Sequence, residues 1–147
     1  MVEPGASRIS TKVSLMGTSS QFDYELLNGQ RVKSIVGLGV DNGKAGLNAE
    51  QVAVCLERET LLISVNPSTD EIILESSDRD ALLGPARRWV SVSSLSQYVG
   101  NELGWSWMAR NYRGYADLFI LSFDALTPQI AFCGAASSLW IYEMRKI

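Results

Sequence analysis

The sequence predicts a mainly β fold of the α+β class, with about seven to eight antiparallel strands in two meanders and one short helix. Apolar and polar residues alternate in many short runs, which is typical of strands with one buried face. Turn-forming pairs such as Asn28-Gly29 and Asn66-Pro67 separate these runs. Apolar residues approach helical spacing in one segment, 93–103, where Ser94 is the expected N-cap and Gly104 follows the end.

The first meander is expected between residues 51 and 75, after a separate strand at 31–36. Alternation with β-branched residues predicts strands at 31–36, 51–57, 61–65 and 71–75. Short turns join the last three, which favours antiparallel neighbours. Before them, 22–27 is apolar enough for a short helix or strand. Residues 37–48 are glycine-rich and predict a flexible hairpin-type connection with Asp41-Asn42-Gly43 at its tip.

The second meander is expected in the last third of the chain. A polar loop at 76–88, with one helical turn near 80–83, leads to a short strand at 89–92. After the helix, alternation predicts strands at 105–110, 116–123, 129–135 and 139–144. The turn residues around Gly114 and the pair Thr127-Pro128 separate them, so these strands should also be antiparallel neighbours.

The chain is expected to form a loose N-terminal arm over 1–20 and a single globular domain over 21–147. The arm is rich in Ser, Thr and Gly, with neither the basic start nor the apolar stretch of a secretory signal. We therefore expect a cytoplasmic location and no membrane partner. Cys55 and Cys133 lie within apolar runs, which predicts two reduced core thiols.

The sequence contains no histidine, and this excludes several classes of catalytic site. Ser-His-Asp and Cys-His pairs and the HExxH zinc helix all need imidazole. The glycine cluster from Gly37 to Lys44 follows a predicted strand, but its spacing does not match a P-loop, and Ala45 stands where magnesium would need Ser or Thr. We expect no catalytic residue, no metal site and no cofactor.

Pairs of carboxylates could still perform acid–base chemistry without histidine. The candidate pairs are Asp70 with Glu71, Asp78 with Asp80, and Glu57 with Glu59. Each pair lies in a predicted turn or at a strand end, where acidic residues are usually solvated. A histidine-free carboxylate-based hydrolase is therefore the alternative function.

The segment from Trp105 to Tyr115 is the most distinctive part of the sequence. Trp105 and Trp107 share one face of a predicted strand, which predicts that both are core residues. The residues expected to project from the following turn and to contact a partner are Arg110, Tyr112, Arg113 and Tyr115. Tyr, Trp and Arg are enriched at protein-binding hot spots, whereas a pI of about 4.9 argues against nucleic acid.

One family resemblance covers roughly residues 22–144 of the chain. It is carried by Gly104-Trp105-Ser106-Trp107, by Asn111 with Gly114-Tyr115 and Asp117, and by the closing Trp140-Ile141-Tyr142. These motifs resemble those of a family of small bacterial proteins of unknown function. Such families are often single cytosolic domains, some beside toxin genes as candidate immunity proteins. The resemblance supports the fold and implies no catalytic residue.

Small size, acidity and the aromatic hairpin together predict a non-enzymatic protein-binding domain. An inhibitor of the immunity type, which occludes a partner protein, is one form that such a domain could take. The expected partner is another protein, with a homodimer left open.

Overall fold

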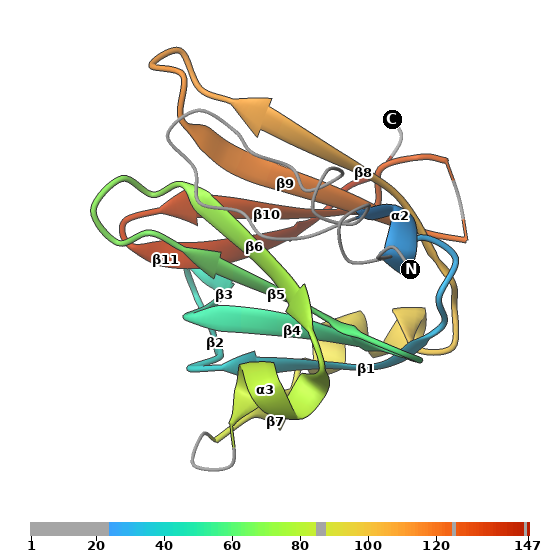
Figure 1. Cartoon of the computed structure of the whole chain (residues 1–147). Coiled ribbons are helices and arrows are strands. Elements are labelled where there is room, and N and C mark those ends of the chain that lie inside the picture. The colour runs from blue at the N-terminus through green and yellow to red at the C-terminus, as the bar shows by residue number, and fades with distance from the viewer. Residues whose placement is uncertain (1–23, 85–87, 125, 146) are drawn as a thin grey trace, which may run out of the picture.

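Two antiparallel β-sheets face each other across a shared hydrophobic core (Figure 1). The structure is a computed structural model that describes residues 24–84, 88–124, 126–145 and 147. The mainly β class expected from the sequence is confirmed, and the described residues form eleven strands. The strand number exceeds the expectation because β2 and β3 form within the segment that was expected to be a flexible connection. The expected arm at 1–20 lies outside the described residues.

The first sheet has five strands in the order β6-β5-β4-β1-β7. Their bounds are β1 Val32–Leu38, β4 Gln51–Leu56, β5 Thr60–Val65, β6 Ile72–Ser77 and β7 Val90–Ser91. Strands β4, β5 and β6 form the expected meander, and β1 pairs with β4 on its other side.

The second sheet has six strands in the order β2-β3-β11-β10-β9-β8. Their bounds are β2 Asp41–Gly43, β3 Gly46–Ala49, β8 Leu103–Arg110, β9 Ala116–Phe123, β10 Ile130–Ala135 and β11 Ser138–Glu143. Strands β8 to β11 form the second expected meander.

The glycine-rich segment 37–48 contains part of the second sheet. Asp41-Asn42-Gly43 was expected at the tip of this connection, but these residues form β2 and pair with β3, so the reversal falls at Lys44 and Ala45. The chain then passes at Glu50 from β3 in the six-stranded sheet to β4 in the five-stranded sheet. This short hairpin therefore connects the two sheets.

Three short helices occur among the described residues: α2 (Tyr24–Leu27), α3 (Arg79–Leu83) and the 3₁₀-helix η1 (Ser93–Tyr98). The α-helix expected over 93–103 is wrong in type and length. Val92, not Ser94, stands at its N-cap without a side-chain hydrogen bond, and Gly100 has a φ of +96° just beyond it. A glycine at positive φ ends helical geometry, and the chain then enters β8.

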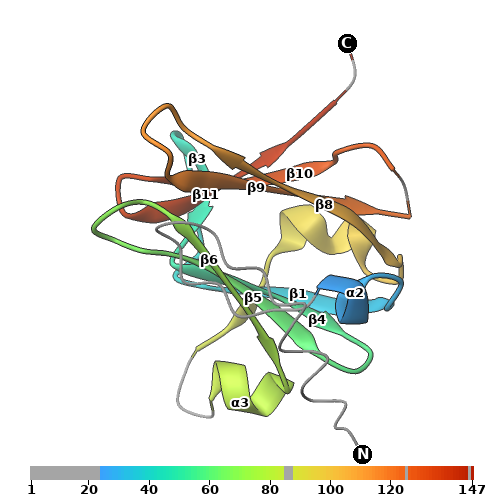
Figure 2. The same ribbon diagram turned by 45° about the horizontal axis from the view of Figure 1, so that its top comes forward.

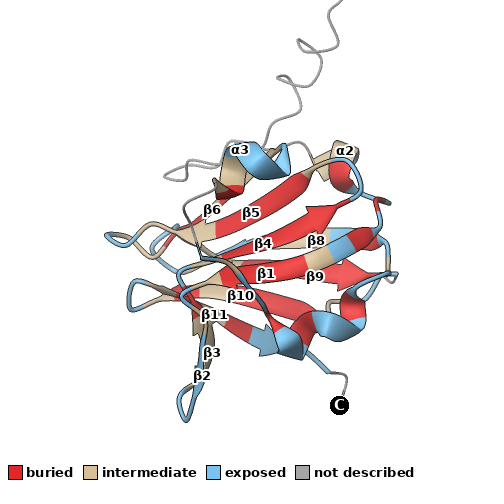
Figure 3. Ribbon diagram, turned by 90° about the horizontal axis from the view of Figure 1, so that it is seen from below, coloured by how far each residue is buried: buried red, intermediate tan, exposed pale blue. Residues whose placement is uncertain are grey.

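The main core lies between the sheets, and a smaller one lies on the outer face of the five-stranded sheet. In the smaller cluster, Leu83 of α3 packs with Val36, Ala53 and Leu62, and Trp89 adds a partly buried ring. Figure 2 shows α3 on the side of this sheet that faces away from the six-stranded sheet. Figure 3 shows the resulting burial along β1, β4 and β5. Strands β4 and β5 carry near-continuous apolar runs because both of their faces are covered.

Among the described residues, no helix is long and apolar enough to cross a membrane.

Candidate protein-binding site

The turn between β8 and β9 is held by the backbone of Asn111. Its N–H donates to the Tyr115 carbonyl at 2.8 Å, and its carbonyl accepts from the Gly114 N–H at 2.9 Å. Gly114 has a φ of +89°, a conformation that glycine adopts without steric cost. This arrangement is a hairpin loop of three residues closed by a glycine in the left-handed region.

The side chain of Asn111 also stabilises the turn. Its Oδ1 accepts hydrogen bonds from the N–H groups of Arg113 at 2.8 Å and Tyr115 at 3.2 Å. Its Nδ2 donates to Oδ2 of Asp117 at 3.1 Å. Asn favours turns because its short side chain can satisfy nearby backbone groups in this way. The loop is therefore fixed in shape before any partner arrives.

The structure brings the four predicted contact residues together on this turn and exposes all of them. Tyr112 is 94% exposed, and Tyr115 is 37% exposed. The guanidinium of Arg113 lies 5.9 Å from the centre of the Tyr112 ring, within cation–π range. Arg110 donates from Nη1 to the Gly114 carbonyl at 2.8 Å. The placement of these residues agrees with the sequence, whereas their role in binding stays a prediction.

The expectation that Trp105 and Trp107 are core residues is wrong. Trp105 is 55% exposed, and Trp107 is only partly buried. Met108 packs against the core instead, opposite the buried Phe119 of β9. The register of β8 with β9 shifts between Leu103 and Ser106, in the stretch that contains Trp105. This irregularity interrupts the alternation that begins at the buried Leu103, so Trp107 pairs with Ile120 and faces outward.

Trp107 belongs to an apolar outer face on the six-stranded sheet. Trp107 pairs with Ile120, Ile120 with Ala131, and Ala131 with Tyr142, so these four residues form one row across β8 to β11. A second row runs through Ala109, Leu118, Cys133 and Trp140. In the described part of the chain, no helix packs on this face as α3 packs on the other sheet. We call these eight residues the outer face.

A hollow of about 370 Å³ lies at the start of β8, at the end of the strand opposite the turn. Two carboxylates, from Glu102 and Asp124, line it together with Trp105 and the 73% exposed Leu126. Asn28 and Gly29, in the turn after α2, form its other side. The hollow is therefore acidic and partly apolar.

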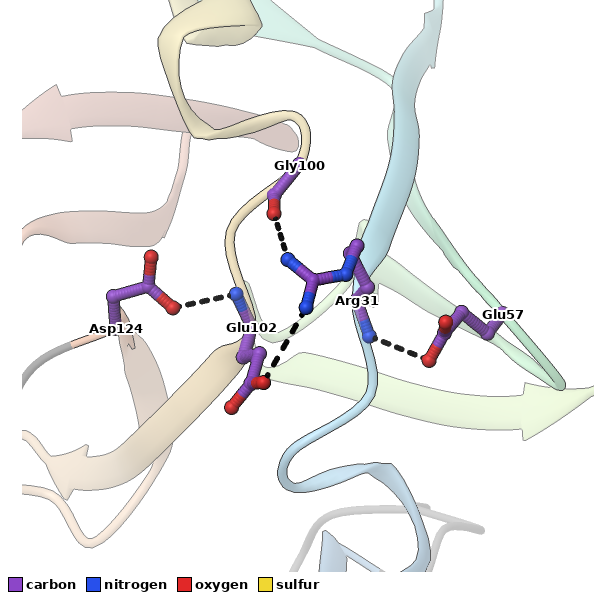
Figure 4. Close-up of polar contacts among 5 residues, drawn as sticks. All are labelled: Arg31, Glu57, Gly100, Glu102 and Asp124. Atoms are coloured by element: carbon purple, nitrogen blue, oxygen red, sulfur yellow. Dashed lines mark hydrogen bonds and ion pairs between the residues drawn. The ribbon is translucent and has the colours of Figure 1, made fainter.

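Figure 4 shows how the acidic residues of the hollow are held. Glu102 and Asp124 are bonded in both directions: the Glu102 N–H donates to Oδ1 of Asp124 at 2.7 Å, and the Asp124 N–H donates to the Glu102 carbonyl at 2.9 Å. Arg31 donates to the Gly100 carbonyl and lies 3.6 Å from the Glu102 carboxylate. Both partners of this ion pair are about half exposed, so its contribution to stability is small. The main-chain bonds therefore place the two carboxylates.

Comparison with protein families gives a match over most of the chain. A model of DUF6334, described as a family of unknown function, matches residues 16–147. The chain belongs to DUF6334. This agrees with the resemblance to a family of unknown function. No curated protein and no solved structure matches the chain.

In this DUF6334 chain, four of the six carboxylates considered for hydrolysis accept hydrogen bonds within the fold. Asp70 accepts from the Ser137 N–H, and Asp78 caps α3 by accepting from the Asp80 N–H. Glu57 accepts from the Arg31 N–H at 3.2 Å, and Glu71 accepts from the Thr69 hydroxyl at 3.0 Å. These contacts are structural, and the carboxylate-based hydrolase stays a prediction.

The two cysteines of the DUF6334 chain are free thiols in different environments. Cys55 is buried, as expected, whereas Cys133 is partly exposed on the outer face, so the core expectation is wrong for Cys133. Burial raises the pKa of the Cys133 thiol, and the negative charges of Asp117 and Asp70 raise it further. Cys133 is therefore a poor nucleophile at neutral pH. Among the described residues, no group of three His, Cys, Asp or Glu side chains could hold a metal ion.

The hollow was not predicted from the sequence. Glu102 and Asp124 are 22 residues apart and belong to no motif. The one local signal is their position, since each lies directly beside a strand end of the β8–β9 hairpin. Residues at the two open ends of a hairpin are neighbours in space, which is enough to place these carboxylates together.

Proposed function

We propose that this DUF6334 chain is a non-enzymatic protein-binding domain that contacts its partner through the β8–β9 turn. One observation carries the proposal: Tyr112 is 94% exposed although its loop is fixed in shape by Asn111. A large aromatic ring held in water on a rigid loop gains no folding energy from its position. It is suited to binding, because little conformational freedom remains to be lost when a partner covers it.

The chemistry of the turn supports a protein partner. Arg110 and Arg113 surround Tyr112, and aromatic and arginine side chains dominate protein-binding hot spots. The two guanidinium groups also favour acidic surface on the partner, since complementary charge speeds encounter and orients it. The outer face of the six-stranded sheet extends from the base of the turn and adds apolar area. An inhibitor of the immunity type remains one prediction within this function.

The test is site-specific photocrosslinking in cells that express the protein. We expect a chain with p-benzoylphenylalanine in place of Tyr112 to form a discrete crosslinked product with one protein. The control carries the same group in place of Arg79, which is exposed on α3 and distant from the turn.

Two results decide the proposal. A discrete product from position 112 that is absent from position 79, and that Arg113→Ala weakens, supports it. Equal labelling at both positions, or no product at position 112, rejects it, because the turn would then contact no specific protein.

A further inference from the structure

We infer that the partner of the β8–β9 turn is a second copy of this chain, paired edge to edge through β8. In this arrangement the turn of each copy lies against the acidic hollow of the other. The inference rests on the proposed function, because it identifies the partner of the same turn. It is carried by the open edge of β8, by the register of its main-chain groups, and by the opposite charges at its two ends.

Strand β8 is the last strand of the six-stranded sheet in the described part of the chain. The Leu121 carbonyl of β9 accepts from the Gln129 N–H, so the main-chain groups of Leu121 face β10. Ser106 lies opposite Leu121 and Met108 opposite Phe119, two residues along. In an antiparallel ladder, a residue opposite one whose N–H and C=O groups point away also points its own N–H and C=O groups away. Ser106 and Met108 therefore direct these groups away from β9, toward the open edge.

At the start of β8, the same edge is already paired with residues Gly29 and Gln30. The Leu103 N–H donates to the Gln30 carbonyl, and the Leu103 carbonyl accepts from the Gly29 N–H. A second strand can therefore pair only with the part of β8 that follows Leu103. Unpaired edge strands are templates for such pairing.

The part of β8 after Leu103 can pair with the same part of a second copy in an antiparallel arrangement. Trp107 of one copy then lies opposite Trp107 of the other. Ser106 of each copy then faces Met108 of the other, and both pairs can exchange main-chain hydrogen bonds. The two Trp107 rings become cross-strand neighbours on the same face, a contact that stabilises sheets. The interface is isologous, so each contact away from the twofold axis occurs twice.

The same register brings opposite charges together. With Trp107 at the twofold axis, the turn of one copy falls beside the hollow of the other, next to the segment in which Arg31 pairs with Glu102. Arg110 and Arg113 then approach a hollow whose carboxylates are Glu102 and Asp124. Trp105, 55% exposed at the border of this hollow, offers a ring face to a guanidinium. Strand β8 thus has a basic end and an acidic end, and antiparallel pairing joins unlike ends.

The charge pattern also excludes a parallel arrangement of two β8 strands. That arrangement would place the arginines of one turn beside those of the other, and like charges at close range are unfavourable. The open stretch is short, so we expect an association at the weak end of specific interfaces, which depends on protein concentration.

The test is analytical ultracentrifugation of the full chain from micromolar to millimolar concentration. The wild type is expected to change from monomer to dimer over this range. Arg113→Glu and Glu102→Lys should each prevent the dimer, since each places like charges at both contacts. An equimolar mixture of the two variants should dimerise again. In the mixed dimer, the carboxylate introduced at position 113 of one chain meets the ammonium introduced at position 102 of the other, and the second contact keeps its native Arg113 and Glu102.

The control for this test is Arg79→Glu, an equal charge change on α3, which should dimerise like the wild type. Melting curves establish that all variants are folded.

Each outcome decides the inference. Recovery of the dimer in the mixture, but in neither variant alone, supports it. A wild type that stays monomeric overturns it, as does a dimer unaffected by either charge reversal. If the chain is monomeric while position 112 still crosslinks to a different protein, the second copy is rejected and the proposed binding function stands. If neither association occurs, both fail.

Discussion

The N–H of Ser137 donates a hydrogen bond of 2.8 Å to Oδ1 of Asp70, which lies 67 residues earlier in the chain. Asp70 is in the turn between β5 and β6, and Ser137 is in the turn between β10 and β11. The Ser137 hydroxyl adds a bond of 2.9 Å to the Pro67 carbonyl in the first turn. One turn from each sheet is therefore bonded to the other at the same end of the core.

Replacement of Asp70 tests this connection. Asp70 has a φ of +64°, a conformation that costs Asn less than Ala. Asp70→Ala removes the acceptor and adds backbone strain, so we expect it to lower the free energy of unfolding by about 2 kcal/mol. Asp70→Asn keeps an acceptor oxygen and the backbone preference and should cost less than about 1 kcal/mol. Urea unfolding of both variants gives the comparison, and equal losses would contradict it.

Gly134 of β10 lies directly under the same turn. A Cβ at this position would overlap the Asp70 carbonyl oxygen and lie 2.8 Å from Cγ2 of Val65. Gly134→Ala should therefore destabilise the protein by about 1–3 kcal/mol, as overpacking does. Gly43→Ala is the matched control, because its Cβ would meet no atom closer than 3.6 Å. If both variants unfold at the same denaturant concentration, the two sheets are not closely packed here.

The outer position of Trp107 has a measurable consequence. Phe132, 1% exposed, lies between the sheets, so Phe132→Ala should cost about 3–5 kcal/mol of stability. Trp107→Ala removes a ring that solvent already reaches, and about 1 kcal/mol is expected. Thermal melts of the two variants distinguish these values. A larger loss for Trp107→Ala than for Phe132→Ala would place Trp107 in the core after all.

The asparagine of the β8–β9 turn should matter more for stability than the arginine that it presents. Asn111→Ala removes the side-chain bonds to Arg113, Tyr115 and Asp117, with an expected cost of about 1–2 kcal/mol. Arg113→Ala should change stability by less than about 0.5 kcal/mol while it weakens partner binding. Chemical denaturation measures the first effect and the crosslinking yield the second. Loss of the fold in Arg113→Ala would contradict this division.

Tyr24 should make stability depend on alkaline pH. Its hydroxyl donates to the Gly104 carbonyl at 2.6 Å, and burial raises its pKa above the usual 10.0. The folded chain then holds this proton at a pH where the unfolded chain loses it. The stabilisation is complete below about pH 10 and falls as pH rises further. Denaturant titrations from neutral pH to about pH 11 should show a smaller fall for Tyr24→Phe than for wild type.

Tyr98 provides a second, separate test by the same measurement. Burial, and then the negative charge of Glu143, also raise its pKa, so Tyr98→Phe should remove a separate part of the fall. A pH dependence that neither substitution changes would assign the effect to other groups.

The sequence by itself determined the local structure of this protein. Alternation located β4 to β6 and β8 to β11, and the turn residues between them determined their antiparallel order. Both signals act between near neighbours in the chain, through side-chain period and backbone conformation. The exposed turn around Tyr112 was predictable for the same reason, since Asn111 and Gly114 specify it locally.

Only the tertiary structure decided which face of each strand is buried and which distant residues meet. A shift of one residue in the pairing of β8 with β9 would exchange the two faces of β8. The observed pairing places Trp107 on the outside and Met108 against the core. The bond between Asp70 and Ser137 and the hollow beside Glu102 have the same origin. They depend on contacts between segments far apart in sequence, which form only when both sheets close on one core, and no local pattern records them.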